Sequence, residues 1–329
     1  ATPILSGLVG SEMCIRDSIY CLLGPTASGK TQMIVELADR YPFEIINVDS
    51  AQIYRGMDIG TAKPDKATLK LTPHRLIDIK DPSEVYSAAD FRRDALDEMA
   101  TIIGSGNVPL LVGGTMLYFK VLREGLSDMP QAHQGIRAQI DKIAVNKGWS
   151  HVHKWLAMVD PESAERIHPN DPQRIQRALE VFLISGNSLT ELHSQVESSA
   201  GNGTFVKRYN FHFFGIQPDD RAVLHKRIEN RFNKMLEMGF VDEVRTLYRR
   251  EELHQALPAI KSVGYKQVWR HLSDEISYEQ MVEQSLAATR QLAKRQLTWL
   301  RRWDNLKTLS DASTKSIDYI LNYVKATSI

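Results

Sequence analysis

Short apolar runs alternate with amphipathic helical patterns over the first 125 residues. Ser87, with Asp90 at the third helical position, predicts a capped helix that continues to about Ile103. Alternating strands and helices are typical of a parallel, doubly wound α/β sheet. The runs that predict strands are Ile19–Leu23, Phe43–Val48, Val108–Val112 and the shorter Arg75–Ile79.

This alternation stops near Leu126, and only helical signals continue to about Gly203. Turn residues, mainly Asp-Pro and Gly, separate these signals, which predicts an all-helical insertion. The polar stretch Ser198–Gly203 then reads as a loop that returns the chain to the sheet. The predicted helices are Gln134–Lys147, Ser150–Met158, Pro161–Ile167 and Pro172–Ser185.

A further strand is predicted at Asn210–Ile216, followed by helices at Asp219–Met238, Val241–Arg250 and Tyr278–Trp303. The first residues show no clear periodicity. We therefore predict four segments: an unassigned segment 1–18, the first part of an α/β core at 19–125, the helical insertion at 126–204, and the second part of the core at 205–329.

The net charge of +1 conceals an uneven distribution. Residues 205–329 contain 21 Lys and Arg against 15 Asp and Glu, whereas both earlier segments are slightly negative. A basic segment suggests binding to a polyanion such as a nucleic acid, although a solvated face gives the same pattern. The basic residues of the last predicted helix are Arg290, Lys294, Arg295, Arg301 and Arg302.

Composition narrows the protein class further. The chain of 329 residues is 43% hydrophobic and 25% charged, as expected for a globular protein. Its two cysteines, Cys14 and Cys21, have neither C-x-x-C spacing nor a nearby His cluster, so we expect no disulfide framework and no zinc site. No membrane span or signal peptide is evident, which predicts a cytoplasmic protein.

The stretch Gly24–Thr31 fits the pattern G-x-x-x-x-G-K-[ST], between an apolar strand and a helix. In that context backbone N–H groups and the positive end of the helix dipole can bind a phosphate chain. Lys30 would meet the outer phosphates, and the Thr31 hydroxyl would be available to hold Mg²⁺. A glycine-rich turn without a ligand is the alternative, but strand, turn and helix all favour a phosphate site.

Asp49 follows the predicted strand Phe43–Val48, at the edge where such sheets bind ligands. It could hold Mg²⁺ through water, accept a proton, or cap the next turn. The strand that ends at Val112 continues directly into Gly113, without the Asp expected of an NTPase. A role in chemistry is therefore favoured for Asp49, and an ATPase or GTPase is disfavoured.

Several blocks, in order from about Ile19 to Trp303, resemble the tRNA dimethylallyltransferases, also called tRNA isopentenyltransferases. Residues 1–18 depart from the family pattern, which puts the natural start of the chain in question. The blocks are Gly24–Thr31, Asp49–Tyr54, Gly56–Pro64, His74–Leu76, Tyr86–Phe91, Gly113–Tyr118, His168–Asp171, Arg174–Glu180, Gly264–Lys266 and Ala293–Leu300.

The resemblance implies that the phosphate site holds dimethylallyl diphosphate rather than a nucleoside triphosphate. C1 of the isoprenoid would be transferred to N6 of the adenosine 3′-adjacent to the anticodon of a tRNA, and pyrophosphate would leave. Mg²⁺ would be the cofactor. The partners would be the tRNA anticodon stem-loop, gripped by the helical insertion, and the diphosphate; we expect a monomer with no membrane contact.

Roles follow residue by residue from the resemblance. Asp49, as the base, Lys30 and Thr26 would be catalytic, and Thr31 would hold the metal ion. The diphosphate would contact Gly24, Pro25, Thr26, Ala27, Ser28, Gly29, Lys30 and Thr31, with Arg221 and Arg227 as further candidates. The tRNA would contact Asp49, Ser50, Ala51, Gln52, Thr115, Arg137, Gln173, Arg174, Ile175, Gln176, Arg177, Lys261, Ser262, Val263, Gly264, Tyr265 and Lys266.

Three alternatives stay open at this point. A nucleotide or small-molecule kinase shares the phosphate loop and the strand-end Asp, but it would consume ATP and would not need the insertion. An isopentenyltransferase acting on free AMP or ATP would leave the insertion and the basic segment without a role. A non-catalytic RNA-binding protein would not require the intact pair Lys30 and Thr31.

Overall fold

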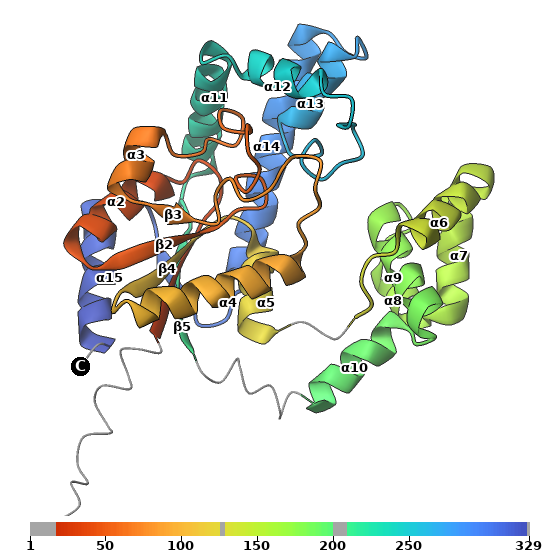
Figure 1. Ribbon diagram of the computed structural model, residues 1–329, viewed down its shortest axis with the longest axis horizontal. Helices are drawn as coiled ribbons and strands as arrows, with labels where there is room; N and C mark the ends of the chain where they lie inside the picture. Colours follow the sequence, from red (N-terminus) through yellow and green to blue (C-terminus); the bar gives the residue numbers. More distant parts are fainter. Residues whose placement is uncertain (1–17, 126–128, 200–208, 328–329) are drawn as a thin grey trace, which may run out of the picture. The chain divides into compact units, whose positions relative to one another are not determined.

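The computed structural model describes residues 18–125, 129–199 and 209–327, and its side chains except those of residues 195–199. The chain divides into two compact units, one within residues 1–123 and 208–329 and the other within 124–207 (Figure 1). The segment 1–17 with Cys14, and residues 200–203 of the predicted loop, lie outside the described residues.

The larger unit is built on one six-stranded sheet with strand order β3-β2-β4-β1-β5-β6, in which every neighbouring pair is parallel. The central strand β1 is buried along its whole length, as expected for an apolar strand covered on both faces. The strands are β1 Ser18–Leu23, β2 Phe43–Val48, β3 His74–Arg75, β4 Val108–Gly113, β5 Asn210–Ile216 and β6 Lys307–Leu309.

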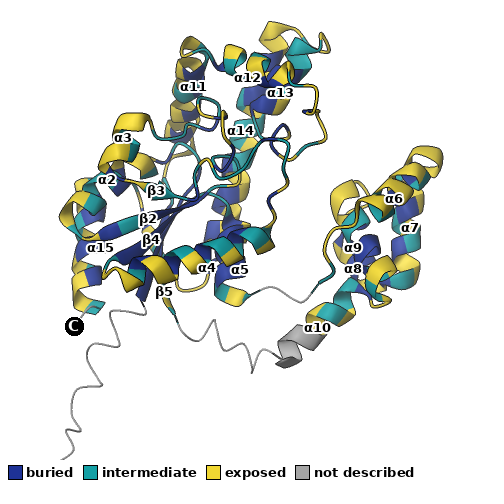
Figure 2. Cartoon of the chain, in the orientation of Figure 1, coloured by how far each residue is buried: buried dark blue, intermediate teal, exposed yellow. Residues whose placement is uncertain are grey.

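Alternate residues of each strand face two separate cores. Ile19, Cys21 and Leu23 belong to one apolar cluster, whereas Tyr20 and Leu22 belong to the other. Figure 2 shows the buried strands between partly exposed helices. The helices of this unit are α2 Lys30–Arg40, α3 Lys66–Leu71, α4 Ala88–Gly104, α5 Met116–Glu124, α11 Arg221–Glu237, α12 Phe240–Tyr248, α13 Tyr265–Leu272, α14 Tyr278–Arg301 and α15 Thr314–Thr327.

Every secondary-structure element described in the smaller unit is a helix, and the unit has a core of its own, centred on Ile140, Leu156, Ile175 and Leu179. Asp160 joins two of its helices, because its carboxylate accepts hydrogen bonds from Ser163 N at 3.0 Å and from the Thr190 hydroxyl at 2.7 Å. The helices are α6 Gln134–Lys147, α7 Trp149–Val159, α8 Pro161–Arg166, α9 Pro172–Ser185 and α10 Leu189–Ser199.

The predicted α/β class and the capped helix are confirmed. The Ser87 hydroxyl accepts from Asp90 N at 3.1 Å, and the Asp90 carboxylate accepts from Ser87 N at 3.0 Å, so α4 begins with a full capping box. The strand predicted at 75–79 is wrong beyond Arg75. Leu76 and Asp78 have φ of 61° and 56°, a left-handed conformation that ends the strand.

Several elements of the structure were not predicted from the sequence, and a few predicted elements begin or end at other residues than expected. Ser18, which we left unassigned, begins β1, and Ser198 and Ser199 end α10 instead of opening a loop. The unpredicted elements range in length from the three residues of β6 to the 14 residues of α15. They are α3, α5, α10, α13, β6 and α15.

Candidate active site

The phosphate-loop motif forms a tight turn between β1 and α2. Ala27 and Gly29 take positive φ values of 61° and 93°, and Ser28 N donates to the Pro25 carbonyl at 3.3 Å. Among the described residues no side chain caps the N-terminus of α2 at Gly29. The first N–H groups of the helix therefore remain available to an anion.

Lys30 is held by the loop itself. Its Nζ donates to the carbonyls of Gly24 and Pro25, both at 2.8 Å, and to the Ser28 hydroxyl at 3.3 Å. Burial and the neighbouring Arg231 guanidinium lower the pKa of Lys30 to about 7, while Asp49 acts in the opposite direction. An anion bound beside this ammonium would favour its charged form and raise the pKa again.

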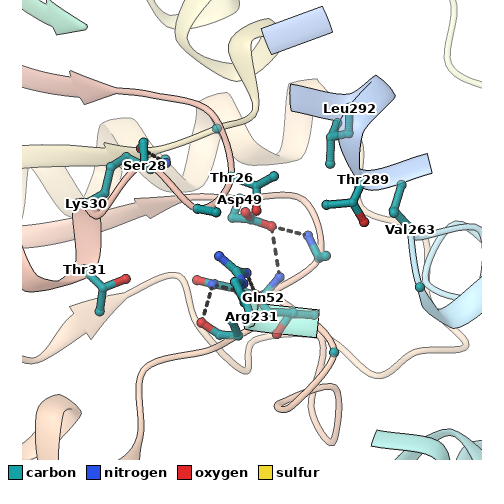
Figure 3. A pocket seen from close by; sticks show the side chains of 18 of the residues that line it. Thr26, Ser28, Lys30, Thr31, Asp49, Gln52, Arg231, Val263, Thr289 and Leu292 are labelled. Carbon is teal, nitrogen blue, oxygen red and sulfur yellow. Dashed lines mark hydrogen bonds between the residues drawn. The ribbon is translucent and has the colours of Figure 1, made fainter. Parts of the chain in front are cut away.

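Asp49 caps the turn that follows β2. Its Oδ1 accepts from Ala51 N at 2.8 Å and from Gln52 N at 3.3 Å (Figure 3). Its other oxygen, Oδ2, has no hydrogen bond from any residue that the structure describes. The turn-cap role that we considered is therefore present, and it leaves one carboxylate oxygen available to a ligand.

The turn after β4 lies directly beside this one. A Cβ on Gly113 would meet the Val48 carbonyl oxygen at 1.9 Å, so no other residue fits there. The Thr115 hydroxyl accepts from Ser50 N at 3.1 Å, which ties the ends of β2 and β4 together.

Gln296 of α14 bridges this turn and the phosphate loop. Its Nε2 donates to the Gly114 carbonyl at 2.9 Å, and its Oε1 accepts from Thr26 N at 3.0 Å. Gln296 lies within the block Ala293–Leu300 that resembles the family, but it was not predicted as a site residue, since a Gln inside a long amphipathic helix gives no signal of its own.

These groups border a cavity of about 430 Å³ in the larger unit. Thr26, Lys30, Thr31 and Asp49 line its polar part, and Figure 3 shows Val263 and Leu292 on the far side of Asp49 from Lys30. The cavity thus combines the turn that carries the phosphate-loop motif with apolar surface. Its apolar lining includes Ile228, Phe232, Met235, Phe240, Val263 and Leu292.

Arg231 of α11 is a candidate site residue that was not predicted from the sequence. It lines the cavity, and its Nη2 donates to the Thr61 carbonyl at 3.4 Å. Burial lowers the pKa of Arg231, and the charge of Asp49 partly offsets that effect. Of the two arginines that we proposed on this helix, Arg227 lines the cavity whereas Arg221 is exposed at the first residue of α11 and does not. The spacing of four residues from Arg227 was the available signal.

The residues of the predicted tRNA-contact segment 261–266 lie in two different environments. Ser262, Val263, Gly264 and Tyr265 line the cavity, while both lysines, Lys261 and Lys266, are exposed outside it. Ser50, Ala51 and Gln52 lie in the turn after β2, with Ala51 and Gln52 on the cavity wall.

In the helical unit, two of the predicted tRNA-contact arginines bind a buried carboxylate. Arg137 donates from Nε and Nη2 to the two oxygens of Glu180 at 2.8 and 3.1 Å, and Arg177 Nη1 donates at 2.7 Å. Burial raises the pKa of Glu180, but these hydrogen bonds outweigh it, and the net pKa is lowered.

The other predicted contacts in α9 differ in exposure. Gln173 and Arg174 are exposed, and Arg174 pairs with Asp171 at 3.2 Å. Gln176 donates to Asp141 Oδ1 at 2.7 Å, and Ile175 is fully buried in the core of this unit. The Ile175 side chain therefore serves packing.

In the parts of the chain that the structure describes, no three His, Cys, Asp or Glu side chains gather into a metal-binding group. No helix there combines the length and the apolar character needed to cross a membrane.

The chain is similar to known proteins over most of its length. Residues 52–303 match the model of the family described as IPP transferase. The crystal structure of the tRNA isopentenylpyrophosphate transferase of Bacillus halodurans is 34% identical, with 95% of this chain and 97% of that chain covered and a TM-score of 0.68.

Two further structures agree. The tRNA delta(2)-isopentenylpyrophosphate transferase of Staphylococcus epidermidis is 32% identical, with 94% and 99% of the two chains covered and a TM-score of 0.65. A eukaryotic dimethylallyltransferase acting on tRNA is 25% identical, with 91% of this chain and 75% of that chain covered and a TM-score of 0.72. With its phosphate loop, strand-end Asp and doubly wound sheet, this chain belongs to the IPP transferase family.

Proposed function

We propose that this enzyme transfers the dimethylallyl group from dimethylallyl diphosphate to N6 of the adenosine 3′-adjacent to the anticodon in tRNA, and releases pyrophosphate. The observation that carries the proposal is the cavity that joins a phosphate-binding turn, a strand-end carboxylate and apolar side chains. Membership of the IPP transferase family and similarity to transferases named for tRNA support it.

In the proposed reaction N6 of the adenine attacks C1 of the donor. The C1–O bond breaks, its electron pair leaves with pyrophosphate, and a new C1–N6 bond forms. N6 must lose one proton. Asp49 is the proposed acceptor, because it lines the cavity and its Oδ2 has no hydrogen bond within the described residues.

Negative charge develops on the departing pyrophosphate, so cations and N–H donors at the phosphate loop would lower the barrier. The first turn of α2 offers backbone N–H groups, and Lys30 and Arg231 line the same cavity. Lys30 would exchange the loop carbonyls that it contacts for phosphate oxygens.

The site also fits Mg²⁺. The Thr31 hydroxyl is exposed on the cavity wall, and the oxygen-rich donor set of hydroxyl, carboxylate and substrate phosphates suits this hard cation. Thr31 would hold it, with Asp49 nearby. When bound, the ion would neutralise charge on the diphosphate.

For the RNA partner we propose the anticodon stem-loop. The target base must leave its stack to reach a buried site, and a separate helical unit gives the enzyme a second surface for RNA. The exposed Gln173 and Arg174, and the exposed Lys261 and Lys266, are the proposed contacts best placed for phosphates. We further propose a monomer that acts in the cytoplasm.

The test is a transfer assay with dimethylallyl diphosphate labelled in the isoprenoid. We expect label in tRNA at the adenosine next to the anticodon, and none in free AMP. Label in AMP would favour the mononucleotide isopentenyltransferase instead. ATP consumption with no transfer would favour a kinase.

A further inference from the structure

Glu243 of α12 is a carboxylate with four hydrogen-bond donors around it. Its Oε2 accepts from the backbone N–H groups of Asp58 and Ile59 at 2.8 and 2.7 Å. Its Oε1 accepts from Gly60 N at 3.1 Å and from the Tyr265 hydroxyl at 2.6 Å. One side chain therefore fixes three consecutive peptide groups, here named the 58–60 loop, and joins them to α13.

Packing holds the same loop from another side. A Cβ on Gly60 would meet Phe240 Cε2 at 2.1 Å and Tyr265 Cε2 at 2.6 Å, so the backbone lies directly against these rings. Both rings are almost fully buried. The loop can approach Glu243 this closely only because residue 60 is glycine.

The residues that follow the loop contact side chains of the active site. The Thr61 carbonyl accepts from Arg231 Nη2 at 3.4 Å and from Gln52 Nε2 at 3.2 Å, and the Ala62 carbonyl accepts from Gln52 Nε2 at 3.3 Å. Figure 3 shows Gln52 and Arg231 next to Asp49. Arg231 and Gln52 line the cavity, whereas Glu243 does not.

We propose that Glu243 is a positioning residue for the donor site: by holding the 58–60 loop it places the Thr61 carbonyl that orients the Arg231 guanidinium toward the diphosphate. The proposal rests on the proposed function, since it takes the anion beside Arg231 to be the diphosphate of the donor. Glu243 does not touch the substrate and acts only through the loop.

The physical reason is the geometry of the acceptors. The bond from Arg231 to Thr61 is long at 3.4 Å, so a small shift of the loop breaks it. Replacing Glu243 by Gln keeps the size but turns one of its two acceptor groups into an NH₂ donor facing N–H or O–H donors. The loop would then lose part of its anchor and move.

The experiment compares full-length Glu243→Gln with the wild type in the tRNA transfer assay. We expect KM for dimethylallyl diphosphate to rise about 10- to 100-fold, by analogy with the loss that follows when the residue orienting a metal ligand is replaced. KM for tRNA should stay within about twofold, because phosphate contacts supply most RNA affinity. Direct binding of inorganic pyrophosphate, measured by calorimetry, should weaken by a similar factor.

Two further variants make the test specific. Tyr265→Phe removes only the hydroxyl donor and should give a smaller shift of the same kind. In the Arg231→Ala background, Glu243→Gln should cause almost no further rise in KM for the donor, because the guanidinium through which Glu243 acts is already absent. Asp242→Asn is the matched control: Asp242 is the neighbouring residue of α12, its side chain is 76% exposed, and its variant should behave as wild type.

Two results would overturn the proposal. One is an unchanged KM for the donor in Glu243→Gln. The other is a lower kcat with both KM values and pyrophosphate binding unchanged and a lower melting temperature, which would mean that Glu243 serves stability alone. A wild-type enzyme that transfers nothing to tRNA but still binds pyrophosphate more tightly than Glu243→Gln would instead contradict the proposed function and leave the positioning role supported.

Discussion

Arg231 of the larger unit and two arginines of the helical unit have different partners. In the larger unit, Arg231 lines a cavity, contacts one backbone carbonyl and lies near the charges of Lys30 and Asp49. In the helical unit, Arg137 and Arg177 donate to Glu180, which is completely buried. Arg174, one turn from Arg177, is 74% exposed.

The difference separates arginines that are available to a ligand from arginines that hold the fold. A buried carboxylate such as Glu180 is costly unless it is paired, so Arg137 and Arg177 are needed in the absence of any RNA. Arg174 does not neutralise a buried carboxylate; among the described residues it pairs only with Asp171, at the surface. Substitutions of these two kinds of arginine should therefore change different quantities.

The largest expected effect is on the chemical step. Asp49→Asn keeps the size and one oxygen acceptor but cannot take the N6 proton, so the single-turnover transfer rate should fall by on the order of 10²- to 10⁴-fold. The measurement is single-turnover transfer at saturating tRNA across a magnesium series. Recovery at high Mg²⁺ would indicate an ion anchor, and a near-normal rate with reduced stability would leave only the turn cap.

A smaller effect is expected on the stability of the helical unit. Glu180→Gln weakens the hydrogen bonds of two arginines and should lower the local opening free energy by about 1–3 kcal/mol. Hydrogen exchange of peptides from α6 and α9 in the full chain measures it, with the exposed Glu165→Gln as the control. Equal protection in both variants would show that the arginines do not depend on this carboxylate.

The same carboxylate gives a pH dependence with a definite sign. Because its pKa is lower folded than unfolded, Glu180 contributes its full stability above the unfolded value of about 4.3. That contribution should be lost as pH falls through the folded pKa. The wild type and Glu180→Gln should therefore converge in local stability on acidification, and a constant difference down to pH 2 would contradict the assignment.

A further effect is one of proton linkage at Lys30. Because the pKa of Lys30 is about 7, its amine is largely neutral at pH 8 in the enzyme without a ligand. A bound diphosphate should restore the positive charge. Binding of dimethylallyl diphosphate at pH 8 should take up close to one proton, and at pH 6 much less. Calorimetry in buffers of different ionisation enthalpy measures the uptake.

Lys30→Ala supplies the reference for that measurement. It should abolish the uptake and most of the turnover, while tRNA affinity stays nearly unchanged, since Lys30 should touch only the leaving group. Equal uptake in wild type and variant would assign the proton to another group, and loss of tRNA binding with transfer preserved would contradict the placement of Lys30.

The smallest effect concerns Arg174. Arg174→Ala should weaken tRNA binding a few-fold and reduce the slope of log Kd against log salt by about one, with no change in hydrogen exchange. Arg177→Ala is the comparison, and it should reduce protection of α9 as well. If Arg174→Ala leaves both affinity and slope unchanged, the side chain is merely solvated.

The parts of the fold that the sequence predicted best are those with a strong local signal. The bounds of β2, β5, α6 and α9 match, because apolar runs and turn residues mark both ends. The segment after Arg75 was misread, since an apolar run gives no warning that Leu76 and Asp78 adopt left-handed backbone angles held by partners distant in sequence.

The same holds for the candidate site: residues with a local sequence pattern could be predicted, and residues without one could not. The phosphate loop and Asp49 could be predicted as site residues because each has a local pattern. Arg231, Gln296 and Glu243 were not predicted, since Arg231 has only its four-residue spacing from Arg227 as a signal, and no local pattern distinguishes Gln296 or Glu243 from the neighbouring residues. Their importance comes from contacts with Thr61, with Thr26 and with the 58–60 loop, which only the folded chain creates.

The parallel pairing of β1 with β5 also has a consequence for synthesis on the ribosome. Ser18 pairs with Asn210, so about 190 residues, including the whole helical unit, must be translated before one edge of β1 finds its partner. At about 5–20 residues per second this takes roughly 10–40 s. During that interval the nascent chain exposes an apolar strand edge, and chaperone binding to β1 should end once β5 emerges.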